Sequence, residues 1–437
     1  MNSEKKDHEK KNHEKKDREI KSKKLTKQEL SWVLYDVGNS AFTLLVATIL
    51  PIYFNSLAEN AGVSSTDYLA WWGYAASIST LLVAFIGPVF GTFSDQKGMK
   101  KPVFICAMLV GAVGCAALTI PSSWIVVLVV FIIAKTGYAA SLVFYDSMLT
   151  DITTPERMDS VSSKGYAWGY IGSCIPFIIS LVFVLMYDSL GITMMTAISI
   201  ALFINAGWWI IMTIPLLKNY HQIYYVEAAE GNQIAATFRR LGSTFKELKQ
   251  HKNIFLFLLS FFFYIDGVYT IIEMATAYGQ ALGLDTTGLL LALLVTQIVA
   301  FPFALLFGRL AAQIDNAKLI RVCILAYFAI ALFAIQLDKQ WEFWLLAVAV
   351  GMFQGAIQAL SRSYFARIIP PEKSGEFFGI FDICGKGASF MGTALIAVIT
   401  QITGNASAGV GVLSIMFIIG FILFGKAARL NETQAGS

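Results

Sequence analysis

The chain has 437 residues, of which 56% are hydrophobic and only 14% are charged, and its mean hydropathy is +0.63. A soluble protein of this size carries roughly a quarter charged residues. The composition therefore excludes an ordinary soluble domain and indicates an all-α, polytopic integral membrane protein, while the small net charge of +4 matters less than where the charges lie.

The chain begins with a mixed-charge tail over residues 1–31, built on a repeated five-residue pattern of glutamate, lysine, and aspartate or asparagine. Such a segment has too few apolar residues to form a core, so it is expected to be disordered or a solvated helix. Eleven lysine and arginine residues in this tail should hold it in the cytoplasm.

Twelve apolar runs follow, each near the roughly 20 residues needed to cross a bilayer. They cover about 32–56, 68–90, 102–121, 124–148, 164–187, 192–217, 253–280, 287–308, 318–337, 342–366, 377–401 and 408–428. The polar connector 218–252 divides them into six and six. We therefore expect an N-terminal bundle over 32–217, a C-terminal bundle over 253–429 and a short tail over 430–437.

The distribution of basic residues supports twelve spans. With both termini inside, 30 of the 33 lysine and arginine residues fall on the inner side, and the outer loops hold only Lys339. The other two, Lys135 and Lys386, lie within spans. This pattern predicts a multi-pass protein of the cell membrane with both termini in the cytoplasm.

The connector carries a helical pattern of its own. Phe238, Leu241, Phe245 and Leu248 recur at helical spacing, with arginine and lysine between them. We expect an amphipathic helix that lies on the inner membrane surface, in contact with lipid headgroups.

The two halves of the chain share landmarks. Pro155-Glu156-Arg157 aligns with Pro371-Glu372-Lys373, 216 residues later, and Gly91 and Gly308 differ by 217. A near-constant offset predicts two related six-helix halves, the arrangement on which many transporters are built.

The loop between the second and third spans contains a recognisable motif. It reads Gly91-Thr92-Phe93-Ser94-Asp95-Gln96-Lys97-Gly98-Met99-Lys100-Lys101. This resembles the inner-loop signature of the major facilitator superfamily, although Gln96 and Met99 depart from its basic positions. The counterpart that begins at Gly308 lacks the aspartate.

Three further stretches are similar to the autophagy-related vacuolar effluxer-like family of that superfamily. They are Trp32–Phe42, Tyr264–Ile272, and Gln358–Ser363 followed by Glu376-Phe377-Phe378-Gly379. The resemblance implies two pseudo-symmetric six-helix bundles. It also implies inner loops that lock one face of the transporter, for which Gly91, Asp95, Gly98, Lys100, Lys101, Arg362 and Glu376 are the candidates here. Yeast members of the family are associated with amino-acid efflux from the vacuole.

In this superfamily the first, fourth, seventh and tenth spans line a central cavity. Polar side chains at membrane depth are functional-site candidates. In those four spans they are Asp36, Asn39, Lys135, Tyr138, Tyr145, Asp146, Asp266, Tyr269, Glu273, Gln354 and Gln358, and the eleventh span adds Asp382 and Lys386.

A charge at mid-membrane needs a partner, so we expect Lys135 to pair with Asp266 or Glu273. Such a pair could be a permanent ion pair that holds the two halves together. Alternatively, it could bind the carboxylate and amine of a zwitterion, or a coupling proton. Asp36 and Asp146, nearer the inner end, favour gating or helix capping over substrate contact. Asp382 and Lys386 are one helical turn apart and could form a local pair.

The sequence therefore predicts a secondary active transporter that moves a small polar solute, such as an amino acid, by alternating access. Two alternatives are an exporter of drugs or lipid-like molecules and a membrane sensor or scaffold that does not transport. The sequence contains no HExxH or GxSxG motif and no paired metal-ligand set, which counts against a membrane enzyme. It also contains no GxxxxGK[ST] motif, which favours an ion gradient over ATP hydrolysis as the energy source. We expect no cofactor, metal or nucleic-acid partner, and a monomer.

Overall fold

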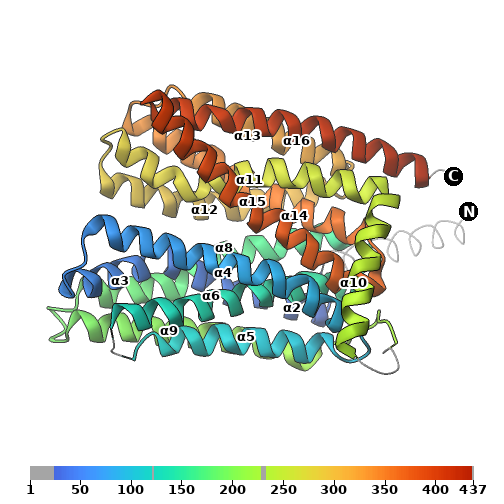
Figure 1. Ribbon diagram of the computed structural model, residues 1–437, viewed down its shortest axis with the longest axis horizontal. Coiled ribbons are helices and arrows are strands. Elements are labelled where there is room, and N and C mark those ends of the chain that lie inside the picture. Colours follow the sequence, from blue (N-terminus) through green and yellow to red (C-terminus); the bar gives the residue numbers. More distant parts are fainter. Residues whose placement is uncertain (1–23, 121–122, 228–232, 436–437) are drawn as a thin grey trace, which may run out of the picture.

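The structure, a computed structural model, describes residues 24–120, 123–227 and 233–435. Expectations for residues 1–23 and 436–437 lie outside these ranges. The described chain forms α-helices joined by short loops, with one 3-10 turn and an isolated bridge between Gln96 and Val226. Two helical bundles pack beside each other, and one helix, α10, runs across the end of both (Figure 1).

The N-terminal bundle contains eight of these helices. They are α2 (Lys27–Ala47), α3 (Ile49–Asn60), α4 (Ser65–Ser94), α5 (Lys100–Ala117), α6 (Trp124–Ser147), α7 (Leu149–Ile152), α8 (Met158–Leu185) and α9 (Met194–Asn219). Helix α2 begins at Lys27, inside the expected tail, because Thr26 and Glu29 form a capping box there. The first predicted span is broken at Thr48, whose backbone leaves the helical conformation (φ −129, ψ −71).

The C-terminal bundle follows the connecting helix α10 (Gln233–Gln250). Its helices are α11 (Lys252–Ala281), α12 (Thr286–Leu310), α13 (Asn316–Ala334), α14 (Gln340–Ile368), α15 (Ser374–Thr403) and α16 (Ala406–Ala435), with the turn η1 (Pro371–Lys373) before α15.

Within the described residues, 11 helices are long and apolar enough to cross a membrane. The remaining predicted span, the eleventh (377–401), corresponds to α15, a 30-residue helix of which the stretch Met391–Thr403 is counted as a shorter apolar segment. The side chains of residues 386–390 lie outside the described part of α15. The helical fold therefore follows the predicted six-plus-six plan.

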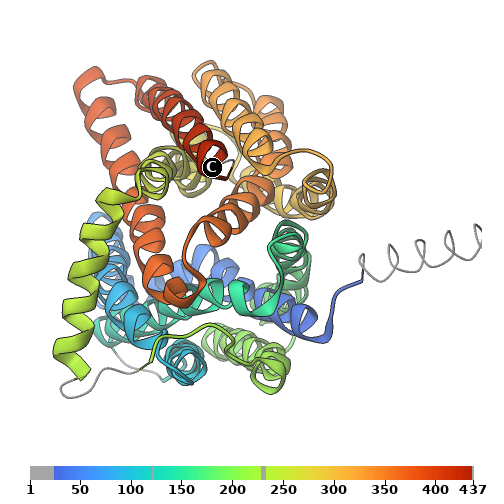
Figure 2. The same cartoon turned by 90° about the vertical axis from the view of Figure 1, so that its right-hand side faces the viewer.

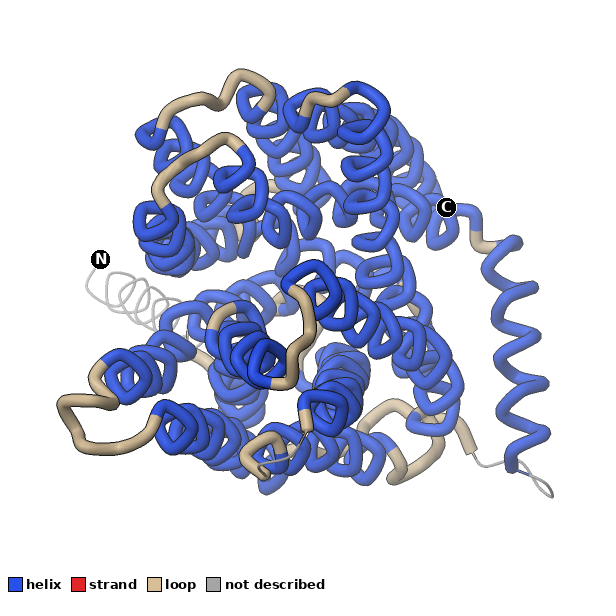
Figure 3. Tube along the Cα trace, turned by 60° about the vertical axis from the view of Figure 1, so that its left-hand side comes forward, coloured by secondary structure: helices blue, strands red, loops and turns tan. Residues whose placement is uncertain are grey.

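The two bundles meet through two pairs of long helices. Helix α4 packs along α15, and α8 packs against α12 and α14. A Cβ atom added at Gly379 would lie 2.6 Å from the backbone of Gly87 and Pro88, so α4 and α15 approach each other as closely as backbones allow. Figure 2 looks onto the end of the two bundles that α10 borders on one side, which we call the connector end. The opposite end, the distal end, comes forward in Figure 3.

Helix α10 turns a different face to the protein from the one its apolar pattern suggests. Thr237, Thr244 and Leu248 are buried, whereas Phe238 remains 48% exposed. The side chain of Phe245 lies outside the described residues. The protein-facing side of α10 is therefore largely polar, and it brings Arg240 toward the junction of the two bundles.

Candidate functional site

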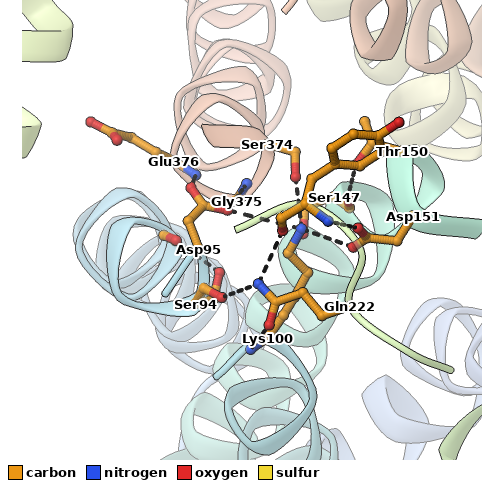
Figure 4. A network of polar contacts seen from close by, with 12 residues as sticks. Ser94, Asp95, Lys100, Ser147, Thr150, Asp151, Gln222, Ser374, Gly375 and Glu376 are labelled. Atoms are coloured by element: carbon orange, nitrogen blue, oxygen red, sulfur yellow. Dashed lines mark hydrogen bonds and ion pairs between the residues drawn. The ribbon is translucent and has the colours of Figure 1, made fainter. Parts of the chain in front are cut away.

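The loop after α4 binds the first turn of α15. The Asp95 carboxylate accepts the backbone N–H groups of Gly375, at 2.7 Å, and Glu376, at 3.0 Å (Figure 4). The first turn of a helix has unsatisfied N–H groups and the positive end of the helix dipole. A carboxylate of the N-terminal bundle therefore caps a helix of the C-terminal bundle.

Lys100 reinforces this junction although its side chain is completely buried. Its Nζ lies 3.1 Å from Oδ2 of Asp151 and 2.8 Å from Oγ of Ser374, and 3.9 Å from Oδ1 of Asp95 (Figure 4). Two carboxylates compensate the buried ammonium, and Ser374 extends the network into α15. We call the set Asp95, Lys100, Asp151, Ser374 and Gly375 the α4–α15 contact.

Helix α10 joins the same contact through Arg240. Its guanidinium lies 3.4 Å from Oδ2 of Asp95 and 3.2 Å from Oε2 of Glu376. Burial raises the pKa of Asp95 to about 7, and the charges of Lys100 and Arg240 and the two N–H bonds only partly oppose this shift. The connector thus ties both bundles together around a carboxyl group that titrates near neutrality.

Arg362 of α14 forms a second cluster between the bundles. Its Nη1 lies 2.9 Å from Oδ1 of Asp146 on α6, and its Nη2 lies 3.4 Å from Oδ2 of Asp36 on α2. Its Nε also donates to Oγ of Ser162 at 2.9 Å. The structure therefore brings three of the predicted site residues, Asp36, Asp146 and Arg362, into one buried ion cluster.

Aromatic rings enclose this guanidinium. Its central carbon lies 4.5 Å from the ring centre of Trp32, 4.4 Å from that of Tyr166 and 5.6 Å from that of Tyr145. Tyr145 is itself fixed, because its ring stacks on Trp32 and its hydroxyl donates to the Trp32 carbonyl. Cation–π contacts and exclusion of water both strengthen the ion pairs.

A third contact lies where α8 begins, on the other side of the interface. Asp159 of α8 accepts Nη2 of Arg367 at 2.6 Å, and it also accepts hydrogen bonds from the Asn316 amide and the Ser363 hydroxyl. We call the set Asp159, Asn316, Ser363 and Arg367 the α8–α14 contact. The loop after Gly308 has no aspartate at the position that corresponds to Asp95, and Asp159 provides the interbundle carboxylate on this side. The carboxylate comes from α8 itself, while α13 and α14 supply the donors.

Farther from the connector end, tyrosines of both bundles gather. Tyr138 of α6 shares a hydrogen bond of 2.7 Å with Thr43 of α2. The hydroxyl of Tyr170 on α8 accepts Nε2 of Gln358 at 3.4 Å. Tyr269 of α11 lies within electrostatic reach of Tyr138, Tyr170 and two carboxylates, Asp146 and Asp382. This region presents hydroxyl groups and negative charge from both bundles.

Lys135 and Glu273 place opposite charges on opposite bundles. Lys135 of α6 is half-buried, its Nζ lies 5.9 Å from the ring centre of Phe131, and its charge acts on the Glu273 carboxylate of α11. Glu273 itself is exposed. Of the two partners considered for Lys135, Glu273 is therefore the one on which its charge acts across the two bundles.

Asp266 is held elsewhere, inside the C-terminal bundle. It is 0% exposed, and its Oδ1 accepts the backbone N–H of Gly392 at 3.1 Å and the Thr270 hydroxyl at 3.3 Å. Its Oδ2 is buried without a hydrogen-bond partner among the described residues.

A cavity of about 90 Å³ lies within the same bundle, lined by Thr270, which donates to this carboxyl group. Helices α11 to α16 line it, mostly with apolar side chains. Its polar lining residues include Thr270 and Gln354, and the Oε1 atom of Gln354 is buried without a partner among the described residues.

The remaining predicted residues have local roles or lie outside the described part. Asn39 donates to the Tyr35 carbonyl one turn earlier, and Gly98 makes a turn with φ +74, which favours glycine. Lys101 is half-buried at the start of α5. The Lys386 side chain is not described, so its expected pairing with Asp382 stays a prediction.

Sequence reasoning missed Asp151, Asp159, Arg240 and Arg367. Their partners lie far away in sequence, and the residues around them carry no motif. Only the internal repeat pointed to Asp159. This residue is the second of α8, and Gly375, 216 positions later, is the second of α15.

The sequence matches one family along nearly all of its length. A family model described as "Vacuole effluxer Atg22 like" matches residues 25–432. The uncharacterized MFS-type transporter YxiO of Bacillus subtilis (strain 168) is 43% identical over 414 residues, covering 94% of this chain and 96% of that protein. Autophagy-related protein 22 of Coccidioides immitis (strain RS) is 22% identical over 426 residues, covering 79% and 70%.

Solved structures of major facilitator transporters share the fold. A bacterial homologue of the iron transporter ferroportin, in an outward-facing state, superposes with a TM-score of 0.69 at 13% identity, covering 92% of this chain and 99% of that one. The transporter FucP, in the outward conformation, superposes with a TM-score of 0.68 at 14% identity, covering 93% of this chain and 99% of that one. At these identities the likeness concerns the fold alone.

Proposed function

The chain belongs to the Atg22-like vacuole effluxer family of major facilitator transporters, and we propose that it moves a small zwitterionic solute, such as an amino acid, by alternating access. The observation that carries the proposal is the facing pair Lys135 and Glu273. One lies on α6 of the N-terminal bundle and the other on α11 of the C-terminal bundle.

A zwitterion suits this pair better than a neutral or singly charged solute. Its carboxylate can replace Glu273 beside Lys135, and its ammonium can replace Lys135 beside Glu273. Each charge of the pair then keeps a partner throughout binding, so neither is left unpaired at membrane depth. The hydroxyl groups of Tyr138 and Tyr269, farther into the interface, supply hydrogen bonds for the rest of the solute.

The contacts at the connector end support the transport cycle. The Arg362 cluster, the α4–α15 contact and the α8–α14 contact all join the bundles near that end. We infer that this conformation is closed at the connector end and gives access from the distal end. Transport requires these contacts to break while the bundles rock about the Lys135–Glu273 pair.

The basic residues give the orientation. We infer that the connector end, with α10 and both termini, faces the cytoplasm of the cell membrane, because 30 of 33 lysine and arginine residues belong to that side. The exposed Phe238 of α10 then meets the inner lipid surface. Both bundles belong to one chain, so a monomer suffices for the cycle.

The first experiment is a thermal-shift screen on the detergent-purified chain, with amino acids and small zwitterions against apolar drugs. A ligand that binds the folded state raises its stability as RT ln(1 + [L]/Kd), so weak substrates register at high concentration. Stabilisation by zwitterions supports the proposal. Stabilisation by apolar drugs alone would favour a drug exporter instead.

The second experiment measures flux of the best ligand in proteoliposomes. Lys135→Ala and Glu273→Gln should each reduce transport at least tenfold, because each leaves a charge of the bound solute without its partner. Lys339→Ala is the matched control, since Lys339 is an exposed lysine in a distal loop. Unchanged flux in both Lys135→Ala and Glu273→Gln would show that the pair does not bind the solute.

A further inference from the structure

We propose that Asp266 is a proton-binding site inside the C-terminal bundle, and that it couples transport to a proton gradient. The proposal rests on the proposed transport function, but not on the identity of the solute. It separates the coupling ion, held at Asp266, from the solute, held at Lys135 and Glu273.

The surroundings of Asp266 favour a neutral carboxyl group. Its side chain is fully buried, Oδ1 receives two hydrogen bonds, and Oδ2 has no partner among the described residues. A buried carboxylate without a compensating cation costs several kcal/mol, and binding a proton removes that cost.

The charged groups on the neighbouring elements do not supply such a cation in the described part of the chain. The charge that acts on Asp266 is that of Glu273, on the same helix, and it is also negative. Helix α15 brings Asp382, whose charge acts on Tyr269, and Lys386, whose side chain is not described. Helices α13 and α16 bring Tyr327 and Phe417, which stack on each other. On α14, Gln354 is uncharged.

A proton fits this site better than a metal cation. Both described partners of Oδ1 are donors, an N–H group and a hydroxyl, and they repel a cation. Among the described residues, no group of three histidine, cysteine, aspartate or glutamate side chains could hold a metal ion. A sodium or divalent ion needs several oxygen ligands at once, whereas a proton needs only one.

The neighbouring cavity offers the proton a route. Its 90 Å³ exceeds the roughly 10–15 Å³ that one water molecule requires, and the polar partners that such a water needs come from Thr270, Thr296, Gln297 and Gln354 in its lining. Thr270 lines the cavity and donates to Asp266, so its hydroxyl links cavity water to the carboxyl group. Hydronium in the cavity gives one proton to the carboxylate and leaves as water, and release to water on the other side reverses that step.

The hydrogen bond from Gly392 connects this site to the contacts between the bundles. Gly392 lies on α15, the helix whose first turn is capped by Asp95. A protonated carboxyl group is a weaker acceptor than a carboxylate, so protonation loosens the bond between α11 and α15. Protonation of Asp266 therefore weakens one of the attachments of α15. This attachment lies several helical turns away from the first turn of α15, which Asp95 caps.

The test combines a spectroscopic arm that needs no solute with a transport arm. Infrared difference spectra of the reconstituted chain, recorded across a pH titration, should show the C=O band of a buried carboxylic acid. Asp266→Asn should abolish that band, while Asp338→Asn, which removes an exposed carboxyl group, should leave it intact. Persistence of the band in Asp266→Asn would overturn the proposal.

In the transport arm, Asp266→Asn should lose accumulation driven by a pH gradient and keep solute exchange without a gradient. Gradient-driven accumulation at the level of the unmodified protein would also overturn the proposal. If Asp266→Asn does not fold, Thr270→Val serves, because it should slow proton exchange without removing the band; an unchanged exchange rate would count against the route. If no zwitterion is transported, the proposed function fails while the infrared result still decides the proton site.

Discussion

Nη1 of Arg362 lies 2.9 Å from Oδ1 of Asp146, and these two residues are 216 positions apart in the chain. The same spacing relates the two Pro-Glu turns that mark the internal repeat. Asp146 and Arg362 therefore occupy equivalent positions in the two halves. Equivalent residues that touch must lie close to the pseudo-two-fold axis, so this ion pair joins the bundles at their centre.

Loss of the Arg362 guanidinium should open the connector end. Arg362→Gln leaves Asp36 and Asp146 buried without their partner, which typically costs about 3–5 kcal/mol. Arg362→Lys keeps the charge but loses the planar contacts with Trp32 and Tyr166 and the second ion pair, so it should rescue only in part. Thermal stability and maleimide labelling of Ser147→Cys, a buried position at the end of α6, measure the two effects.

The matched control for that change is Arg321→Lys. Arg321 also stacks on an aromatic ring, Phe421 at 4.7 Å, but it is exposed and belongs to one bundle only. It should leave both stability and labelling nearly unchanged. Equal behaviour of the Arg362 and Arg321 variants would show that the central ion pair does not hold the bundles together.

The α8–α14 contact should show direct coupling between Asp159 and Arg367. A double-mutant cycle with Asp159→Asn and Arg367→Gln should give a coupling energy on the order of 1 kcal/mol, because the pair is mostly buried and spans the bundles. The control cycle uses Lys97 and Glu227, whose side chains are 63% and 75% exposed and 3.9 Å apart. The pair Lys97 and Glu227 should show almost no coupling energy. Similar values from both cycles would refute a role for the α8–α14 contact.

Much of the fold was predictable, because spans and loops are written locally in the sequence. Apolar length marked the helices, the basic residues supported an even number of spans, and Gly91 and Asp95 marked the loop that caps α15. The break at Thr48 was missed although the sequence marks it, because Pro51, three residues later, has no N–H to donate to the carbonyl of Ala47. The sequence did not predict that the protein-facing side of α10 is largely polar, because the periodic pattern of Phe238, Leu241, Phe245 and Leu248 indicated an apolar face.

The candidate site was predictable as a set of residues and not as a set of pairs. Asp36, Asp146 and Arg362 were each singled out, but nothing local indicates that one guanidinium binds both carboxylates. For Lys135 the sequence left Asp266 and Glu273 open. In the structure the charge of Lys135 acts on Glu273, whereas Asp266 is enclosed within its own bundle, a difference that spacing alone does not resolve.

Close packing of α4 against α15 should depend on Gly379. A methyl group at Gly379→Ala would lie 2.6 Å from the backbone of Gly87 and Pro88, so the helices must separate. Overpacking of this kind typically costs about 1–3 kcal/mol. Gly73→Ala is the control in α4, because a Cβ there meets nothing within 4 Å. We expect a lower melting temperature and faster labelling of Ser147→Cys for Gly379→Ala only.

The α4–α15 contact should respond to pH through Asp95. Burial raises the pKa of this carboxyl group from its ordinary value near 4 to about 7 in the folded chain. Between those two values the folded state holds the proton more firmly than the unfolded state. The contribution of Asp95 to stability is therefore fully present at low pH and is lost as the pH rises through about 7.

Melting curves between pH 5 and pH 8 measure this dependence as a slope. Asp95→Asn should have a lower melting temperature throughout, because its amide group faces the N–H groups of Gly375 and Glu376. Its decline with rising pH should nevertheless be shallower than that of the unmodified chain. Asp188→Asn, an exposed carboxyl group in the loop after α8, should keep the original slope. An unaltered slope in Asp95→Asn would assign the pH dependence to other groups.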